Sequence, residues 1–151
     1  MLNRQQSEHP PYFSVIIPVY NKEEHVARAI RSVLEQTYDN FELLVVCDPS
    51  TDKSNEQVRQ FYDSRLRVFY RDQPGPGGYA ARNLGIQNAR GQYISFLDAD
   101  DEWWSGHLAH HRRLIAESGC ALVATSWLDC REGDQPRFTS LSDETSDGVL
   151  F

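Results

Sequence analysis

Three aspartates, Asp98, Asp100 and Asp101, follow the short apolar run "YISFL" within four positions. Alternate residues of an extended segment point to the same side, so the carboxylates of Asp98 and Asp100 can converge on one cation. Mg²⁺ and Mn²⁺ prefer oxygen ligands, and a site with two carboxylates is usually completed by water and phosphate oxygens. The spacing therefore predicts a divalent-metal site for a diphosphate. By itself such a cluster is more often a solvated turn with a helix cap, but its context favours the metal site.

Other residues suited to ligand binding also follow apolar runs of the sequence. Ligands of open α/β sheets bind outside the carboxyl ends of the strands. We therefore expect one crevice at these ends, supplied by Pro18, Tyr20 and Asn21 after the first run, Asp48 after the second, Arg82 after the "PGPGG" loop, and Asp98 and Asp100 after the fourth.

Strands and helices must alternate along the chain to position these residues. Apolar, β-branched runs predict strands at 13–19, 41–46, 66–70, 93–97 and 121–127. Between them, apolar residues recur at helical spacing, as in the segment that begins at Val26. Asn21 and Glu24 resemble a capping box for the first helix, and Gly119 is expected to end the last one. Such alternation predicts an α/β fold with a mostly parallel sheet and helices on both faces.

Composition excludes several classes of protein. A chain of 151 residues fits one domain, and a formal charge of −7 with no basic run argues against a nucleic-acid partner. The longest apolar stretches are too short to span a bilayer, and the N-terminal segment lacks the apolar centre of a signal peptide. Three cysteines without metal-finger spacing indicate reduced thiols. We predict a cytoplasmic protein that can contact the inner face of the membrane and can self-associate.

The segments "VIIPVYNKEEHVARAIRSVLEQTYDNFELLVV", "DPSTDKS" and "GGYAARNLGIQNARGQYISFLDADDEW" occur in this order. Together they resemble the nucleotide-binding half of a family-two glycosyltransferase of the GT-A fold, from about residue 14 to about residue 128. The resemblance implies a Rossmann-like sheet flanked by helices. We expect an N-terminal arm at 1–12, a nucleotide-sugar-binding core at 13–130, and a polar segment at 131–151 that begins an incomplete acceptor half.

The resemblance also assigns roles to individual residues. Asp100 would bind Mg²⁺ or Mn²⁺ directly, and Asp98 would lie by the ribose and the water shell of the metal. Tyr20 would stack on the base, Asp48 would accept a hydrogen bond from it, and Arg82 would line the nucleotide pocket. An aromatic ring and a carboxylate suit the flat face and the imide N–H of uracil. Structural alternatives are that Tyr20 covers the core, Asp48 caps a helix and Arg82 forms a surface salt bridge.

The sequence departs from the family pattern in two respects. Family members usually carry "DDGS" after the second strand, whereas this chain reads "CDPS", with Cys47 and Pro49 in place of an acid and a glycine. If the first acid of the pair reads the base, Asp48 is the wrong residue. Family catalytic domains also continue for about a hundred residues beyond the metal motif, so the general base would lie beyond Phe151.

The resemblance implies a metal-dependent, inverting transfer of sugar from a nucleotide-diphosphate sugar, with UDP as the expected nucleotide. The acceptor would be a carbohydrate or a lipid-linked hydroxyl, as in the biosynthesis of cell-surface polysaccharides. A non-catalytic or truncated nucleotide-sugar-binding module is the main alternative. A nucleotidyltransferase is a weaker one, since the "AARN" and "DADD" segments together argue against it.

Overall fold

The computed structural model describes residues 10–73, 75, 78–123, 127–129 and 137–139. The chain divides into two compact units, the first ending at His110 and the second beginning at His111. The first unit contains the main sheet and is described first. The predicted segment boundaries at residues 12 and 130 remain a prediction.

Four parallel strands form the sheet of the first unit, in the order β3-β2-β1-β4. They are β1 (Phe13–Val19), β2 (Phe41–Cys47), β3 (Leu66–Tyr70) and β4 (Tyr93–Phe96). The central strands β1 and β2 are buried along almost their whole length, which explains their continuous apolar sequences. The first four predicted strands are confirmed to within one residue at each end.

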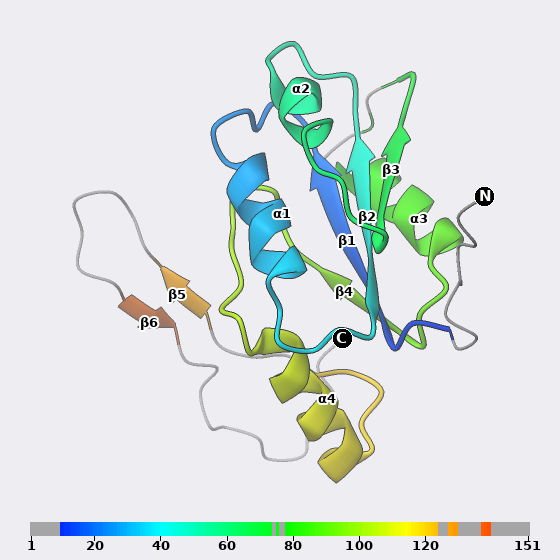
Figure 1. Cartoon of the computed structure of the whole chain (residues 1–151), viewed down its shortest axis with the longest axis vertical. Helices are drawn as coiled ribbons and strands as arrows, with labels where there is room; N and C mark the ends of the chain where they lie inside the picture. Colours follow the sequence, from blue (N-terminus) through cyan, green and yellow to red (C-terminus); the bar gives the residue numbers. More distant parts are fainter. Residues whose placement is uncertain (1–9, 74, 76–77, 124–126, 130–136, 140–151) are drawn as a thin grey trace. The chain divides into compact units, whose positions relative to one another are not determined.

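Helices cover both faces of this sheet. The chain moves from β1 through α1 (Val26–Leu34) to β2, and through α2 (Ser54–Val58) to β3, and then returns through α3 (Tyr79–Asn88) to β4 on the other side of β1. Because crossover connections are right-handed, this reversal places α3 on the face opposite α1 and α2, as Figure 1 shows. The carboxyl ends of β1 and β4 therefore form the switch point at which such sheets bind ligands.

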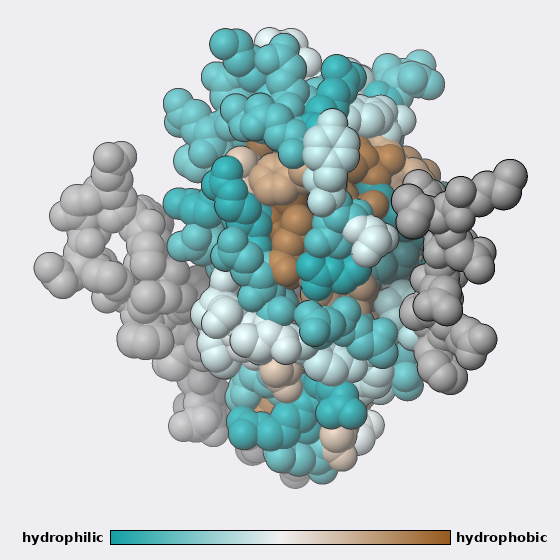
Figure 2. Space-filling model, viewed as in Figure 1, coloured by the Kyte–Doolittle hydropathy of each residue, from teal (hydrophilic) through white to brown (hydrophobic). Residues whose placement is uncertain are grey.

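The core lies between the sheet and these helices. One stripe of α1 is fully buried, as the helical spacing predicted. On the other face α3 approaches β1 closely, because a Cβ atom added at Gly85 would lie 2.6 Å from Cγ2 of Ile16. On the face seen in Figure 2, hydrophilic residues cover most of the described surface, and hydrophobic residues show in a band near its centre.

The predicted capping box at the start of α1 is wrong. The helix begins at Val26, and the capping position is held by His25, which makes no side-chain cap hydrogen bond. Asn21 instead adopts a left-handed backbone conformation with φ of 49°, which asparagine tolerates better than most residues. A turn follows in which the N–H groups of His25 and Val26 donate to the carbonyl of Lys22, so Asn21 and Glu24 do not occupy the capping positions.

The second unit contains the end of α4 (His107–Ser118) and a two-stranded antiparallel hairpin. Gly119 follows α4 with φ of +66°, and its N–H donates to the carbonyl of Ile115, so the predicted helix end is confirmed. In the hairpin, β5 (Trp127–Asp129) pairs with β6 (Arg137–Thr139).

The predicted strand at 121–127 is wrong at residues 121–123. Residues 121–123 belong to no strand, and residues 124–126 lie outside the described residues. Trp127 is in a strand, but that strand pairs with β6 and not with the main sheet. Leu122 is 73% exposed, so the apolar run does not mark a buried strand here.

Among the described helices, none combines the length and the hydrophobicity that a membrane span requires.

Candidate functional site

A pocket of about 250 Å³ lies at the carboxyl ends of the strands. We call it the strand-end pocket. Every predicted site residue except Asn21 contributes to its lining. The lining residues are Pro18, Val19, Tyr20, Lys22, Asp48, Gly78, Arg82, Asp98, Ala99 and Asp100. Residues that are up to 82 positions apart in the sequence, from Pro18 to Asp100, thus meet at the switch point of the sheet.

Asp98 forms an ion pair with Arg82 across this pocket. Asp98 follows β4, and Arg82 lies in the first turn of α3. Gly78 precedes that helix with φ of +70°, and a Cβ atom there would lie 3.0 Å from Nη1 of Arg82. Glycine therefore suits both the backbone conformation and the space beside the guanidinium. The carboxylate of Asp98 is 53% exposed, so a ligand can reach it.

Asp100 forms a second ion pair, with Lys22, at a distance of 2.6 Å between Oδ2 and Nζ. The hydrogen bond from Lys22 holds the pKa of Asp100 below its ordinary value, although partial burial opposes this shift. The backbone carbonyl of Asp100 accepts a separate hydrogen bond of 2.9 Å from Arg28. The main chain and the carboxylate of Asp100 are therefore held by different partners.

Asp101 differs from the other two aspartates of the cluster. It does not line the strand-end pocket, and its backbone N–H donates to the carbonyl of Asp98 at 3.0 Å, which closes a turn. Burial raises the pKa of Asp101, and repulsion from Asp100 and Asp98 adds to this effect. Asp98 and Asp100 therefore share the pocket lining and Asp101 does not; that the first two hold one metal ion remains a prediction.

Asp48 is almost fully buried at the end of β2, and its carboxylate forms an ion pair with Arg71, which follows β3. Cys47, the preceding residue, lies inside β2 and is buried in the core. Burial raises the pKa of its thiol to about 12, so Cys47 remains a neutral thiol. Of these two neighbours, Asp48 is the one that lines the pocket.

Tyr20 lines the pocket and is 49% exposed. Its ring is accessible from the pocket; that it stacks on a base remains a prediction. Tyr20 directly follows the last residues of β1, where Pro18 also lines the pocket.

Hydrogen bonds join the turn after β1 to the turn after β2. The side-chain oxygen of Asn21 accepts from the N–H of Thr51 at 2.9 Å, and the N–H of Lys22 donates to Oγ of Ser54 at 2.7 Å. Asp52 accepts from the N–H of Glu23 at 3.0 Å. Asn21 thus fixes the position of its neighbours; its predicted contact with a nucleotide remains a prediction.

The chemistry of the donor atoms at Asp98 and Asp100 fits Mg²⁺ or Mn²⁺. Within the described part of the chain, no group of three or more His, Cys, Asp or Glu residues could hold a metal ion. Two accessible carboxylates on one pocket are nevertheless the usual protein share of a site that phosphate oxygens and water complete. The residues therefore suit a metal that binds together with a diphosphate.

Sequence reasoning missed two basic residues of this region, Lys22 and Arg71. Each carries the charge that balances an aspartate, Asp100 and Asp48 respectively. Arg71 directly follows β3, and Lys22 lies three residues after β1. Both residues lie just beyond the carboxyl end of a strand, and this position was the available signal. The carboxyl ends of all strands in a parallel sheet lie at the same edge.

The sequence and the fold of this chain are similar to those of known proteins. A sequence model of the family described as "Glycosyl transferase family 2" matches residues 14–145. WfgD of Escherichia coli, a UDP-Glc:alpha-D-GlcNAc-diphosphoundecaprenol beta-1,3-glucosyltransferase, is 42% identical over 95 residues, which are 63% of this chain and 37% of WfgD.

Two solved structures share the fold. TarS 1-349 of S. aureus in complex with UDP-GlcNAc has a TM-score of 0.63 and 30% identity, over 71% of this chain and 32% of TarS 1-349. The mannosyltransferase PcManGT from Pyrobaculum calidifontis, in complex with GDP-Man and Mn²⁺, has a TM-score of 0.66 and 26% identity, over 74% of this chain and 34% of PcManGT. The predicted GT-A fold is thus confirmed over the part of the chain that these structures cover.

The chain spans between 13% and 54% of the length of the curated relatives compared with it.

Proposed function

The chain belongs to glycosyl transferase family 2, and we propose that its strand-end pocket binds the nucleotide diphosphate of a sugar donor, with UDP as the nucleotide. The observation that carries this proposal is the convergence on one pocket of two accessible carboxylates, two basic side chains and an exposed aromatic ring. Each of these groups matches one part of a nucleotide diphosphate. The family match supports the general activity, and the pocket supports the choice of ligand.

The diphosphate would lie beside Asp98, Asp100, Lys22 and Arg82. Asp98 and Asp100 would hold Mg²⁺ or Mn²⁺, which supplies positive charge to the leaving diphosphate. Arg82 lines the same pocket, where its planar guanidinium can donate two hydrogen bonds to phosphate oxygens. PcManGT, which this chain resembles, was solved with Mn²⁺ and a nucleotide-sugar, and this supports the metal in the proposal.

The base would lie between Tyr20 and Asp48. The Tyr20 ring can stack on a pyrimidine face. The ion pair with Arg71 fixes the carboxylate of Asp48 at the end of β2, where it can accept a hydrogen bond from the imide N–H of uracil. The names of two relatives support UDP, since TarS was solved with UDP-GlcNAc and WfgD is described as using UDP-Glc.

The sugar would pass to a hydroxyl of a carbohydrate or lipid-linked acceptor, with inversion at the anomeric carbon. The lipid-linked acceptor is supported by the name of WfgD, which contains a diphosphoundecaprenol, and we infer a role in the biosynthesis of cell-surface polysaccharide. Attack by the acceptor requires a general base that removes its proton. None of the residues that line the strand-end pocket suits that role, because Asp98 and Asp100 are committed to the metal and Asp48 to Arg71.

Donor binding without transfer is the second candidate function. It is favoured by the lining of the strand-end pocket, in which each of the three carboxylates already pairs with a basic side chain. Release of UDP from a UDP-sugar distinguishes the two candidates, since a binding module leaves the donor intact.

A melting-temperature screen tests the proposed nucleotide. UDP and dTDP with Mn²⁺ should stabilise the 151-residue chain more than ADP or GDP, because a purine needs more room and a different hydrogen-bond pattern. The same screen without a divalent ion gives the baseline for each nucleotide. Stabilisation by GDP alone would show that the assignment of Tyr20 and Asp48 to the base is wrong.

A further inference from the structure

We propose that Lys22 is a positioning residue of the donor site, which neutralises Asp100 before the metal binds and then contacts the donor diphosphate. This inference rests on the proposed function of the strand-end pocket. It adds a role for a residue that sequence analysis had not included in the site. Its basis is the 2.6 Å ion pair between Lys22 and Asp100 and the place of both residues in the pocket lining.

The backbone of Lys22 is firmly held while its side chain is accessible. Its N–H donates to Oγ of the buried Ser54 at 2.7 Å, and its carbonyl accepts from the N–H of His25 at 3.0 Å and of Val26 at 2.9 Å. The side chain is 35% exposed. The ammonium group can therefore change its partner by rotation about side-chain bonds, without any movement of the turn.

Asp100 can also change its partner without moving its backbone. Arg28 donates to the backbone carbonyl of Asp100 at 2.9 Å and also lies 3.5 Å from the carboxylate of Glu102. These contacts remain when the carboxylate of Asp100 turns from an ammonium group to a metal ion. The ion pair itself is 35% and 45% exposed at its two members, and accessible pairs of this kind are weak and readily exchanged.

The charges of the pocket make such an exchange favourable. With Lys22 on Asp100 and Arg82 on Asp98, both carboxylates are balanced before ligand binding. A metal ion that binds alone must displace Lys22 and stay close to its positive charge, which opposes binding. When a diphosphate enters with the metal, its own negative charge gives the ammonium a new partner. Lys22 therefore favours joint binding of metal and diphosphate over binding of the metal alone.

The test is to replace Lys22 with methionine and to measure two affinities. Mn²⁺ alone, titrated and followed by electron paramagnetic resonance, should bind K22M about ten times more tightly than wild type, because the competing charge is gone. UDP at saturating Mn²⁺, followed by calorimetry, should bind K22M about ten times more weakly, because a charged hydrogen bond to phosphate is lost. A residue with a merely structural role would not move the two affinities in opposite directions.

The chain offers a matched control, since Lys53 is its one other lysine. Lys53 is exposed and does not line the strand-end pocket, so K53M should leave both affinities within twofold of wild type. K22R keeps the charge and should also stay near wild type in the Mn²⁺ titration. If K22M does not fold, judged by its melting transition, Lys22→Gln takes its place.

Three outcomes are decisive. Unchanged or weaker Mn²⁺ binding by K22M would overturn the role of Lys22 as the counter-ion of Asp100. Unchanged UDP affinity of K22M at saturating Mn²⁺ would overturn its contact with the diphosphate. Failure of wild type to bind UDP with Mn²⁺ would instead overturn the proposed function, so the two failures are told apart by the wild-type titration.

Discussion

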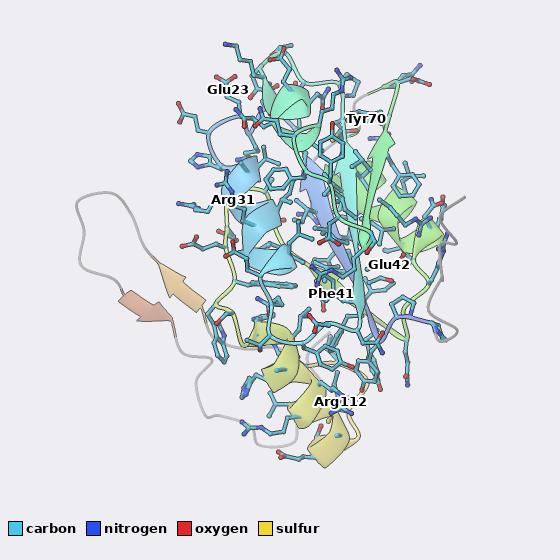
Figure 3. All side chains as sticks on the ribbon, viewed as in Figure 1. Glu23, Arg31, Phe41, Glu42, Tyr70 and Arg112 are labelled. Carbon is cyan, nitrogen blue, oxygen red and sulfur yellow. The ribbon has the colours of Figure 1, made fainter. Side chains whose placement is uncertain are left out.

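The two ends of the sheet both carry acids paired with basic side chains, but the acid at the amino ends is buried and those at the carboxyl ends are accessible. At the amino ends of the strands, Glu42 is buried and accepts from Ser14 at 2.8 Å, from Arg67 at 2.8 Å and from the N–H of Arg90 at 2.6 Å. At the carboxyl ends, Asp98 and Asp100 are about half exposed. Figure 3 labels Glu42 toward the lower, amino end of β2 and Tyr70 toward the upper, carboxyl end of β3.

The difference shows how a structural acid can be told from one that is available to a ligand. The oxygens of Glu42 already have three partners, and the hydroxyl of Ser14 in turn accepts from the N–H of Gly91 at 2.8 Å. These bonds tie the start of β4 to β1 and β2. A ligand could reach Glu42 only by breaking them, whereas Asp98 and Asp100 can exchange their basic partners without disturbing the sheet.

Replacement of Glu42 with glutamine should have the largest effect on stability. Loss of one partner of a buried ion pair leaves Arg67 without its counter-charge and costs about 3 kcal/mol of unfolding free energy. Urea unfolding, followed by circular dichroism, measures this change. Glu117→Gln, on the exposed Arg113 pair, is the control and should change stability by less than about 0.5 kcal/mol. Equal effects of the two substitutions would remove the contrast between buried and exposed acids.

The same change of acid to amide at Asp100 should have a much smaller effect on stability. The pair with Lys22 is accessible to water, and pairs of this kind contribute roughly 0 to 1 kcal/mol. Asp100→Asn should therefore unfold within about 1 kcal/mol of wild type in the same urea experiment. A loss as large as that of Glu42→Gln would mean that Asp100 holds the fold together and is not free to bind a ligand.

The smallest expected effect is a change in the pH dependence of stability. The hydrogen bond from Arg65 lowers the pKa of Asp63 below 3.8, so Asp63 binds a proton more readily when unfolded. The contribution of Asp63 to the unfolding free energy is present at neutral pH. It is lost as the pH falls through the lowered pKa of Asp63 in the folded state. Asp101 has a raised pKa and acts in the opposite sense, because its charged form is disfavoured in the folded state.

Unfolding free energies measured between about pH 5 and pH 3 test this assignment. Asp63→Asn should make stability less dependent on pH than in wild type, and Asp101→Asn should make it more dependent. Slopes that change in the same direction in both variants would contradict the opposite pKa shifts.

Much of the carboxyl end of the sheet could be predicted from the sequence. Regular alternation of strands and helices fixes which residues follow each strand, and parallel strands bring these residues to one edge. For this reason Tyr20, Asp48, Arg82, Asp98 and Asp100 were expected in one crevice, and all five line the pocket.

The side-chain partners of the buried and paired acids could not be predicted, because they come from distant parts of the sequence and no local pattern indicates them. Glu42 and Ser14 are polar residues inside apolar strands, and their partners come from residues as far along the chain as Arg90 and Gly91. The partners of Asp100 and Asp48 are likewise set by side-chain packing across elements. The apolar run at 121–127 predicted a strand because it is apolar, but burial depends on what covers a segment, and Leu122 is exposed.

Calorimetric titration of UDP into the 151-residue chain, with and without Mn²⁺, tests the central claim most directly. Wild type should bind UDP with Mn²⁺ and lose most of this affinity without a divalent ion, because the charges of Asp98 and Asp100 are only balanced by Arg82 and Lys22, and the metal supplies the positive charge that a diphosphate needs. Asp100→Asn should bind about a hundredfold more weakly with Mn²⁺, while Asp39→Asn, at the opposite end of the sheet, should match wild type. Equal UDP affinity with and without Mn²⁺, or full affinity in Asp100→Asn, would contradict the assignment of this pocket to a metal and a diphosphate.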